Sequence, residues 1–205
     1  MDRKTTNSLL ALTLAIAVLG IAGPAQAATI TVNTGSDTTP SGSECLGVAG
    51  DCSLRRALDK AVSGVDNIVI PASVPTITLV AGNGSLHVQK DLTISGQGPG
   101  SNTITGQDNL GLIAITGLRT VTISGVTLTH GKATTGAAID TDAGHLTLNN
   151  VAVTNNTSGG SDLEGFGVVH VGGASPGSLN ITGSSFSSNH VGGGGTSGTG
   201  FGVVS

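Results

Sequence analysis

The hydrophobic pattern of this chain changes its period after residue 64. Before that point, four apolar residues recur at the spacing of one helix face: Leu54, Leu58, Ala61 and Val62. Ser53 is placed as the N-cap of this helix and Gly64 as its stop. Beyond Gly64 the apolar residues come in short β-branched runs bounded by proline and glycine, such as NIVI at 67–70 and TITLV at 76–80. The pattern predicts one short helix followed by strands and turns.

An internal repeat organises these strands. Four similar segments recur at intervals of roughly 25 to 33 residues, a period typical of solenoids: LTISG at 92–96, VTISG at 121–125, LTLNN at 146–150 and LNITG at 179–183. A second short strand follows three of them, at 126–130, 151–155 and 184–189. Apolar strands opened by glycine complete the repeat, at 111–115, 136–140, 167–171 and 201–205. Three strands per repeat with no helix between them indicate the coil of a parallel β-helix.

Alternation within the strands predicts which side chains fill the core. Pairs such as Val121 with Ile123, and Val126 with Leu128, would point inward and leave threonine and serine outside. We therefore expect an all-β fold, a right-handed parallel β-helix solenoid with a short N-terminal capping α-helix. Four to five rungs about 4.8 Å apart would make a rod roughly 20–25 Å long. The expected organisation is a signal peptide at 1–27, an N-terminal cap at 28–66 and β-helix coils at 67–205.

The first 27 residues have the form of a secretory signal peptide. Charged residues at 2–4 precede an apolar run at 9–21, and Ala25-Gln26-Ala27 supplies the small-residue pattern that a signal peptidase recognises. The apolar run is shorter than the roughly 20 residues of a transmembrane helix. We expect the protein to be exported, and to be secreted or held at the cell surface with no transmembrane span after signal cleavage.

Cys45 and Cys52 are the two cysteines of the chain. In an exported protein, oxidising conditions favour a disulfide between them, which would staple the loop before the helix. A two-ligand metal site is the alternative. It is disfavoured because neither cysteine belongs to a CxxC pair and the chain has no further cysteines.

Composition narrows the classes of function. Charged residues make up 10% of the chain, aromatic residues 1%, and the formal net charge is −4. This balance argues against nucleic acid as a partner and leaves few donors for phosphate or uronate chains. The absence of Trp and Tyr also removes the usual stacking platforms for sugar rings.

The segment CSLRRAL at 52–58 resembles the CSLREA motif that opens many bacterial secreted right-handed parallel β-helix proteins. Further segments extend the resemblance: Cys45, TITVNTGSD at 29–37, DNIVIP at 66–71 and TITL at 76–79. The later coils are similar to repeats of the pectate-lyase-like kind. Arg56 stands where the motif has glutamate, so the reciprocal half of a capping box is absent. The resemblance implies export and a β-helix, whereas proteins of this type include surface-anchored and adhesin-like members with no single activity.

Enzymes of the pectate-lyase-like fold work on the outer face of one parallel sheet. On the register that we expect, the outward positions of the glycine-opened strands on successive rungs are Thr116, Asp140 and His170. Asp140, Asp142 and His170 are therefore the candidates for acid, base or metal-ligand chemistry. Ordinary solvated side chains are the favoured alternative. Arg119 has no acidic cluster in register, so the match to a uronate lyase is poor.

Three polar residues align at the end of the third strand in consecutive coils: His130, Asn155 and Asn189. We expect a polar ladder at a turn, in which these side chains bond to the backbone of adjacent rungs. The remaining histidines are scattered along the chain, and we expect them to be solvated.

The function expected from these patterns is a non-catalytic secreted or cell-surface domain in adhesion or in contact with extracellular polysaccharide or a host or matrix surface. No cofactor or metal is expected. The alternatives are a polysaccharide lyase or glycoside hydrolase, and the structural stalk of a larger surface protein. The chain ends at GFGVVS inside an expected strand with no C-terminal cap in view, which favours an N-terminal piece of a longer protein.

Overall fold

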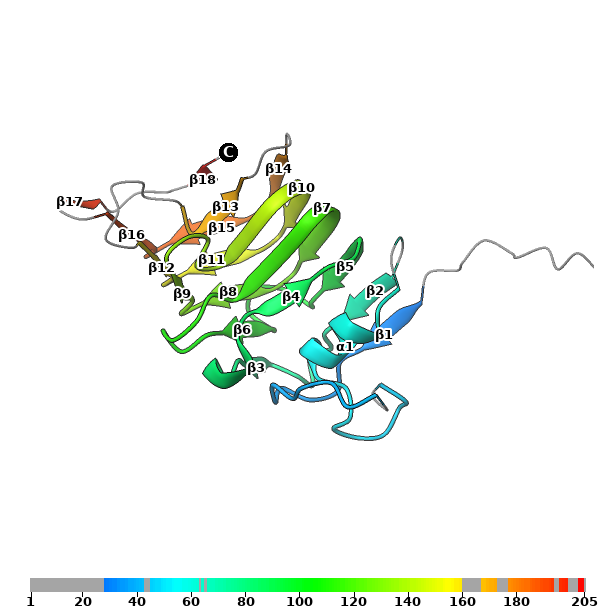
Figure 1. The fold of residues 1–205 in the computed structure, drawn as a ribbon. Coiled ribbons are helices and arrows are strands. Elements are labelled where there is room, and N and C mark those ends of the chain that lie inside the picture. Colours follow the sequence, from blue (N-terminus) through cyan, green and yellow to red (C-terminus); the bar gives the residue numbers. More distant parts are fainter. Residues whose placement is uncertain are drawn as a thin grey trace, which may run out of the picture.

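The computed structural model describes residues 28–42, 45–62, 64, 66–159, 167–172, 177–193, 196–198 and 203–204. The predicted signal peptide at 1–27 lies outside these residues. The chain forms a right-handed parallel β-helix of about 4 turns, preceded by one short helix (Figure 1). The fold class predicted from the repeat is therefore confirmed.

Three sheets form the faces of the coil. Sheet A contains β1 (Thr29–Thr31), β2 (Asp66–Val69), β4 (Leu86–Val88), β5 (Leu92–Ser95), β7 (Ile113–Ser124), β10 (Ile139–Asn149), β13 (Val169–Val171), β14 (Ser178–Thr182) and β18 (Val203–Val204). Sheet B contains β3 (Thr76–Thr78), β6 (Thr103–Thr105), β8 (Thr127–Thr129), β11 (Ala152–Thr154) and β15 (Ser185–Ser187). Sheet C contains β9 (Lys132–Ala133), β12 (Thr157–Ser158), β16 (His190–Gly193) and β17 (Thr196–Gly198). A 3₁₀ turn, η1 (Ala81–Asn83), links β3 to β4.

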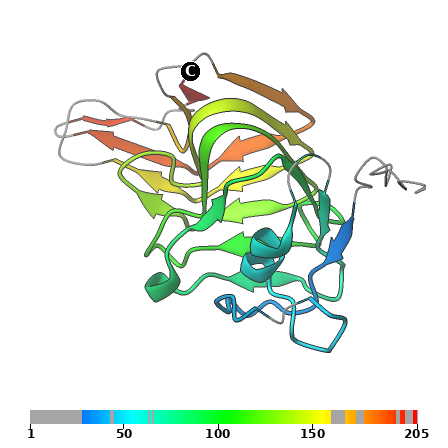
Figure 2. The ribbon, with the colours of Figure 1, turned by 45° about the vertical axis from the view of Figure 1, so that its right-hand side comes forward.

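Sheet A has two limbs because β7 and β10 each run through a bend without a break. In the first limb, β4 pairs with the start of β7, and in the second limb β5 pairs with its end. Gly117, whose φ of 78° favours glycine, lies at the bend, and the register of β7 with β10 shifts between Thr141 and Ala143. Both strands arch over the coil in Figure 2.

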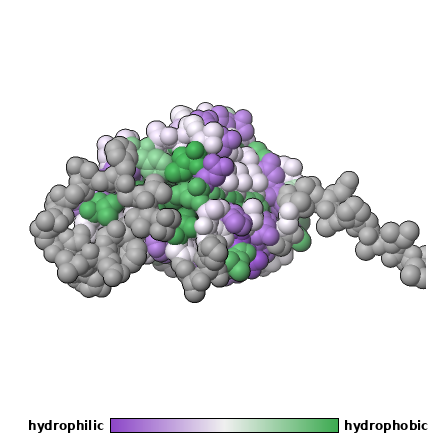
Figure 3. All heavy atoms as spheres, turned by 90° about the horizontal axis from the view of Figure 1, so that it is seen from above, coloured by the Kyte–Doolittle hydropathy of each residue, from purple (hydrophilic) through white to green (hydrophobic). Residues whose placement is uncertain are grey.

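Inward side chains stack in columns from coil to coil. The column of the second limb consists of Ile68, Ile94, Ile123 and Leu148, all buried. The column of sheet B consists of Ile77, Ile104, Leu128 and Val153, also buried. The predicted alternation is thus confirmed, and burial of each such side chain stabilises the fold by about 1.5–3 kcal/mol. On the last described coil, Ile181 is 38% exposed, and the view from above shows hydrophobic residues at that end (Figure 3).

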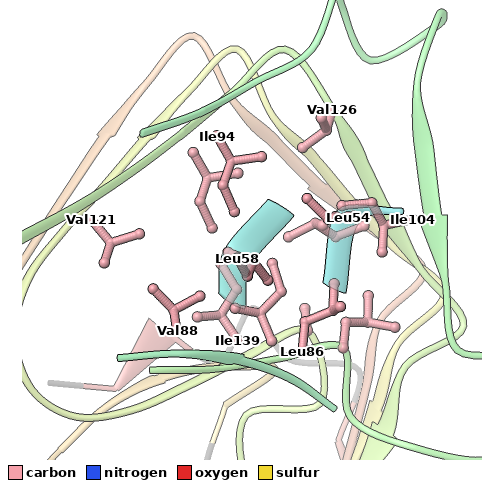
Figure 4. Packing of buried hydrophobic residues seen from close by; sticks show 14 of the residues in the cluster. Leu54, Leu58, Leu86, Val88, Ile94, Ile104, Val121, Val126 and Ile139 are labelled. Carbon is pink, nitrogen blue, oxygen red and sulfur yellow. The ribbon is translucent and has the colours of Figure 1, made fainter. Parts of the chain in front are cut away.

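Helix α1 (Leu54–Lys60) occupies the place of a first-limb strand in the first coil, because it leads into β2 as β4 leads into β5, and it contacts β4. Ser53 is its N-cap, with the side-chain oxygen accepting a hydrogen bond from Arg56 N at 3.2 Å. Leu54 and Leu58 are buried and lie among the core side chains of the coils (Figure 4). The helix therefore closes the N-terminal end of the core.

The helix is shorter than its apolar spacing suggests. It ends at Lys60, and Val62, predicted on the buried stripe, is 65% exposed. The reason is local: Ala61 has the extended conformation, and the Asp66 carboxylate accepts a hydrogen bond from Val62 N at 2.5 Å. This contact turns the chain toward β2 before the helical pattern is complete.

The loop before the helix is closed by the Cys45–Cys52 disulfide, whose Cα atoms lie 4.4 Å apart. Asp51, next to the bridge, accepts hydrogen bonds from Leu46 N at 2.8 Å and from the Asn33 side chain at 3.0 Å. The bridge and this carboxylate together fix the loop against the first coil.

Candidate functional site

The first limb of sheet A brings two of the predicted site residues into contact. Asp140 on β10 and His170 on β13 are opposed in register, and His170 Nδ1 lies 2.7 Å from Asp140 Oδ1. Thr135 Oγ1 donates a hydrogen bond to the second carboxylate oxygen of Asp140 at 3.2 Å. The side chains are 41% exposed for Asp140 and 21% for His170, so the pair faces solvent. A carboxylate that orients an imidazole can support acid–base chemistry.

Thr116, expected beside Asp140 and His170 in one outward column, does not lie there. Ile139 pairs with Ile113 and not with Ile115, so the outward neighbour of Asp140 on β7 is Ala114 rather than Thr116. The register follows from the loop between β9 and β10, whose length the repeat alone does not fix. His87 continues the column on β4, opposite Ala114.

Asp142 is exposed and follows the buried Thr141, on the same strand as Asp140. It stands at the register shift between β10 and β7, where the regular ladder is interrupted. Within the described part of the chain, no three His, Cys, Asp or Glu side chains are grouped so that they could hold a metal ion.

The second limb of sheet A presents a different surface, which we call the hydroxyl–amide face. Its outward positions on β5, β7 and β10 form two columns, Thr93, Thr122 and Thr147 beside Ser95, Ser124 and Asn149. All of these side chains are half-buried or exposed, and none is charged. Because adjacent strands lie about 4.8 Å apart, the face presents evenly spaced neutral hydroxyl and amide groups. Ser95 Oγ already donates to Asn67 Oδ1 and Ser124 Oγ to Ile94 O, so these two hydroxyls are left as acceptors.

Shallow grooves lie at both edges of this face. The groove at the start of the strands is lined by Gly64, Asp91, Leu92, Thr93, Thr120 and Thr122. In it, Asp91 Oδ1 accepts a hydrogen bond from Thr120 N at 2.9 Å. The acidic group is thereby tied to the backbone, and the remainder of the lining is hydroxyl and apolar.

The groove at the end of the strands is lined by Gly96, Gln97, Gly98, Ser124, Gly125, Asn149 and Asn150. Gly125, with φ of 62°, leaves it open, since a Cβ there would stand 2.6 Å from the carbonyl oxygen of Gly96. The exposed side chains of Gln97 and Asn150 flank this gap from different coils. Side-chain amides both donate and accept hydrogen bonds, as neutral sugars require of a binding site.

The predicted polar ladder is displaced by one residue. His130 and Asn155 are neighbours with positive φ, but the strand register places Ser188 rather than Asn189 beside Asn155. The hydrogen-bonded ladder is formed instead by Asn156 and Asn189, with Asn156 Nδ2 donating to Asn189 Oδ1 at 3.1 Å.

This asparagine ladder is a structural feature of the core. Asn156 is fully buried, accepts a hydrogen bond from Gly131 N at 2.8 Å and donates to Leu128 O at 3.0 Å. Asn189 donates to Val153 O at 2.8 Å. These amides satisfy backbone groups where the coil turns from sheet B into sheet C, so they are not available to a ligand.

Comparison with models of protein families, with curated proteins and with solved structures finds no match to this chain. In the described part of the chain, no helix has the length and apolar character that crossing a membrane requires. The site residues that sequence reasoning missed are those of the second groove, Gln97, Asn149 and Asn150. They are ordinary turn residues in the sequence, and only the superposition of coils brings them together.

Proposed function

We propose that this protein is an extracellular, non-catalytic binding domain for neutral polysaccharide, and that the hydroxyl–amide face of sheet A is its contact surface. The observation that carries the proposal is the pair of grooves at the two edges of this face. A polysaccharide lying along the strands would pass from the threonines of one groove to the amides of the other. The Cys45–Cys52 disulfide supports an extracellular setting.

The chemistry of the face favours an uncharged ligand. An acidic polymer would need cationic partners, and neither groove contains Lys or Arg. Asp91 would repel such a polymer at one edge. Neutral sugar hydroxyls, by contrast, match threonine, serine and amide side chains in both donor and acceptor capacity.

The strength of binding follows from the same composition. The chain has no Trp or Tyr on which sugar rings could stack. Each hydrogen bond exchanged with water contributes only about 0.5–1.5 kcal/mol, so a single short oligosaccharide is held weakly. An extended polymer that contacts both grooves at once gains from multivalency, which suits adhesion to a wall or matrix better than capture of a small sugar.

The proposal is tested by affinity electrophoresis in gels that contain a neutral glucan, a neutral mannan or an acidic pectin. The purified protein is expected to be retarded by at least one neutral polymer and not by pectin. Gln97→Ala, which removes an exposed amide from the second groove, is expected to weaken the retardation several-fold. Gln89→Ala is the matched control, because Gln89 is also exposed but lies outside both grooves.

A second candidate function is glycan cleavage by a lyase or glycoside hydrolase at the first limb. The 2.7 Å contact between Asp140 and His170 favours it, since a carboxylate would hold the imidazole in one orientation. Release of reducing ends or unsaturated sugars from any polysaccharide, abolished by Asp140→Asn, would establish cleavage. Binding without release would leave the non-catalytic proposal in place.

A further inference from the structure

Sheet B carries a regular array of hydroxyl groups on its outer surface. Two columns run across its five strands in register: Thr76, Thr103, Thr127, Ala152 and Ser185 in the first, and Thr78, Thr105, Thr129, Thr154 and Ser187 in the second. We call this surface the threonine array. Every position in it except Ala152 is threonine or serine, and none is charged.

The array is regular in both directions. Neighbours in a column lie on adjacent strands about 4.8 Å apart, and the columns are two residues apart, or about 6.6–6.8 Å. No register shift interrupts any of the four strand pairs, in contrast to sheet A. The strands lie stacked one above another in Figure 2.

The side chains of the array have little freedom to disturb this spacing. Threonine is β-branched, so its hydroxyl and methyl groups keep few orientations on a strand. Behind the array, the column of Ile77, Ile104 and Leu128 is buried and close-packed, which holds the backbone in place. The result is a rigid two-dimensional pattern of hydroxyl and methyl groups.

We propose that the threonine array is an ice-binding face, whose ligand is the surface of crystalline water. Hexagonal ice presents rows of oxygen atoms whose repeats lie close to the strand spacing of the array and somewhat above the spacing between its columns. Threonine hydroxyls can exchange hydrogen bonds with lattice waters while the methyl groups fill the gaps between them. An uncharged surface suits this ligand, because charged side chains hold hydration shells of their own that do not fit the lattice. A flat solid also requires neither a deep pocket nor aromatic residues.

The threonines of the array nearest the N-terminus are the most accessible to ice. Thr129 is buried, with its Oγ1 2.9 Å from His130 Nδ1, and Thr127 donates a hydrogen bond to Pro99 O. Thr76 is exposed on the edge strand β3, and Thr103 is half-buried beside it on β6. Substitutions at Thr76 and Thr103 therefore test the array most directly.

The experiment measures ice-recrystallisation inhibition and the shape of single ice crystals in solutions of the purified protein at about 0°C. We expect the protein to shape crystals and suppress recrystallisation. Thr103→Lys, which places a charged, flexible side chain between Thr76 and Thr127 of the array, is expected to raise the concentration needed at least tenfold. Thr76→Lys is expected to act in the same direction, and at this exposed edge position it leaves folding intact.

Thr157→Lys is the matched control. Thr157 is a half-buried outward threonine on β12 of sheet C, and it already lies beside Lys132 in register. The Thr157→Lys variant is expected to retain the ice-binding activity of the unchanged protein. Circular dichroism and thermal melting check that all variants are folded. Absence of crystal shaping and of recrystallisation inhibition in the unchanged protein would overturn the proposal. Full activity in Thr76→Lys and Thr103→Lys, or equal loss in Thr157→Lys, would also overturn it.

Discussion

Arg55 on helix α1 forms a two-point ion pair with Asp37, which lies in the segment that precedes the helix. Arg55 Nε lies 2.7 Å from Asp37 Oδ1, and Arg55 Nη2 donates to Asp37 Oδ2 at 3.0 Å. The side chains are only 10% and 1% exposed. The same guanidinium donates to Gly84 O and Ser85 O, so it joins the helix to the turn before β4. In this chain, the first arginine of CSLRRAL is therefore a structural residue of the cap.

Removing one partner of this ion pair is expected to destabilise the cap strongly. Arg55→Ala leaves the Asp37 carboxylate buried without its cation, which costs about 3–5 kcal/mol in the free energy of unfolding. Urea denaturation followed by circular dichroism measures the loss. Lys60→Ala, at an exposed position at the end of the same helix, should change the unfolding free energy by no more than about 0.5 kcal/mol. Equal effects of the two substitutions would contradict the role of the ion pair.

Stability should fall in acid because of Asp37. Burial raises the pKa of Asp37, but hydrogen bonds from Arg55, Val80 N and Asn83 and the Arg55 charge outweigh burial and hold the pKa below its ordinary value of 3.8. A carboxyl whose pKa is lower in the folded state stabilises the fold above its unfolded pKa, and this contribution is lost as the pH falls. Urea midpoints should therefore be constant above about pH 5 and decrease below about pH 4.

Asp37→Asn should flatten this acid dependence, although the variant is less stable at neutral pH. Desolvation raises the pKa of Asp51, but hydrogen bonds from Asn33, Leu46 N and Val48 N and the Arg56 charge outweigh desolvation and lower this pKa as well. A smaller residual slope should consequently remain. An acid dependence unchanged by Asp37→Asn would assign the effect to other carboxyls.

Opening the disulfide should have a local and moderate effect. The bridge closes a short loop, since its cysteines are 7 positions apart, and the chain-entropy model gives a stabilisation of about 2.5 kcal/mol. A Cys45→Ser, Cys52→Ser double variant should lose about that much unfolding free energy. Dithiothreitol should reduce the stability of the unchanged protein but not that of the double variant. Sensitivity of the double variant to dithiothreitol would show that another process is being measured.

The buried asparagine ladder should contribute to the free energy of unfolding although its side chains are polar. Asn156→Ala leaves Gly131 N and Leu128 O without their side-chain partner inside the coil, at a cost of about 1–3 kcal/mol. Asn109→Ala, in an exposed turn, removes only a local bond to Gln107 O and should be nearly neutral. Thermal melting of both variants gives the comparison, and a neutral Asn156→Ala would exclude the ladder as a stabilising element.

The sequence predicts the inward columns of this fold but not its coil-to-coil register. Alternation fixes the direction of Ile123 and Leu128 within each strand, because a strand has a period of two. Register across coils depends on loop length and on the bulge near Gly117, and neither can be derived from strand composition. The expected pairing of Asp140 with His170 is confirmed. The expected pairing of Thr116 with Asp140 is wrong, because the register places Ala114 opposite Asp140.

The unknown register also explains why the polar ladder at the turn was predicted one residue away from its place. Asn155 and Asn156 are adjacent in sequence, and only the pairing of Thr154 with Ser187 decides which of them meets Asn189. The grooves beside the hydroxyl–amide face combine residues from different coils, so their composition is a consequence of register as well. The helix end was misplaced because a tertiary contact, Asp66 to Val62 N, overrides the apolar spacing.

The most direct test of the proposed function is a titration of the isotopically labelled protein with a soluble neutral oligosaccharide, followed by backbone amide NMR shifts. We predict that shift changes concentrate on the hydroxyl–amide face and its second groove, at Thr122, Ser124 and Asn149 above all. Shifts confined to the first limb around Asp140 and His170, or no shift with any neutral glycan at millimolar concentration, would contradict it.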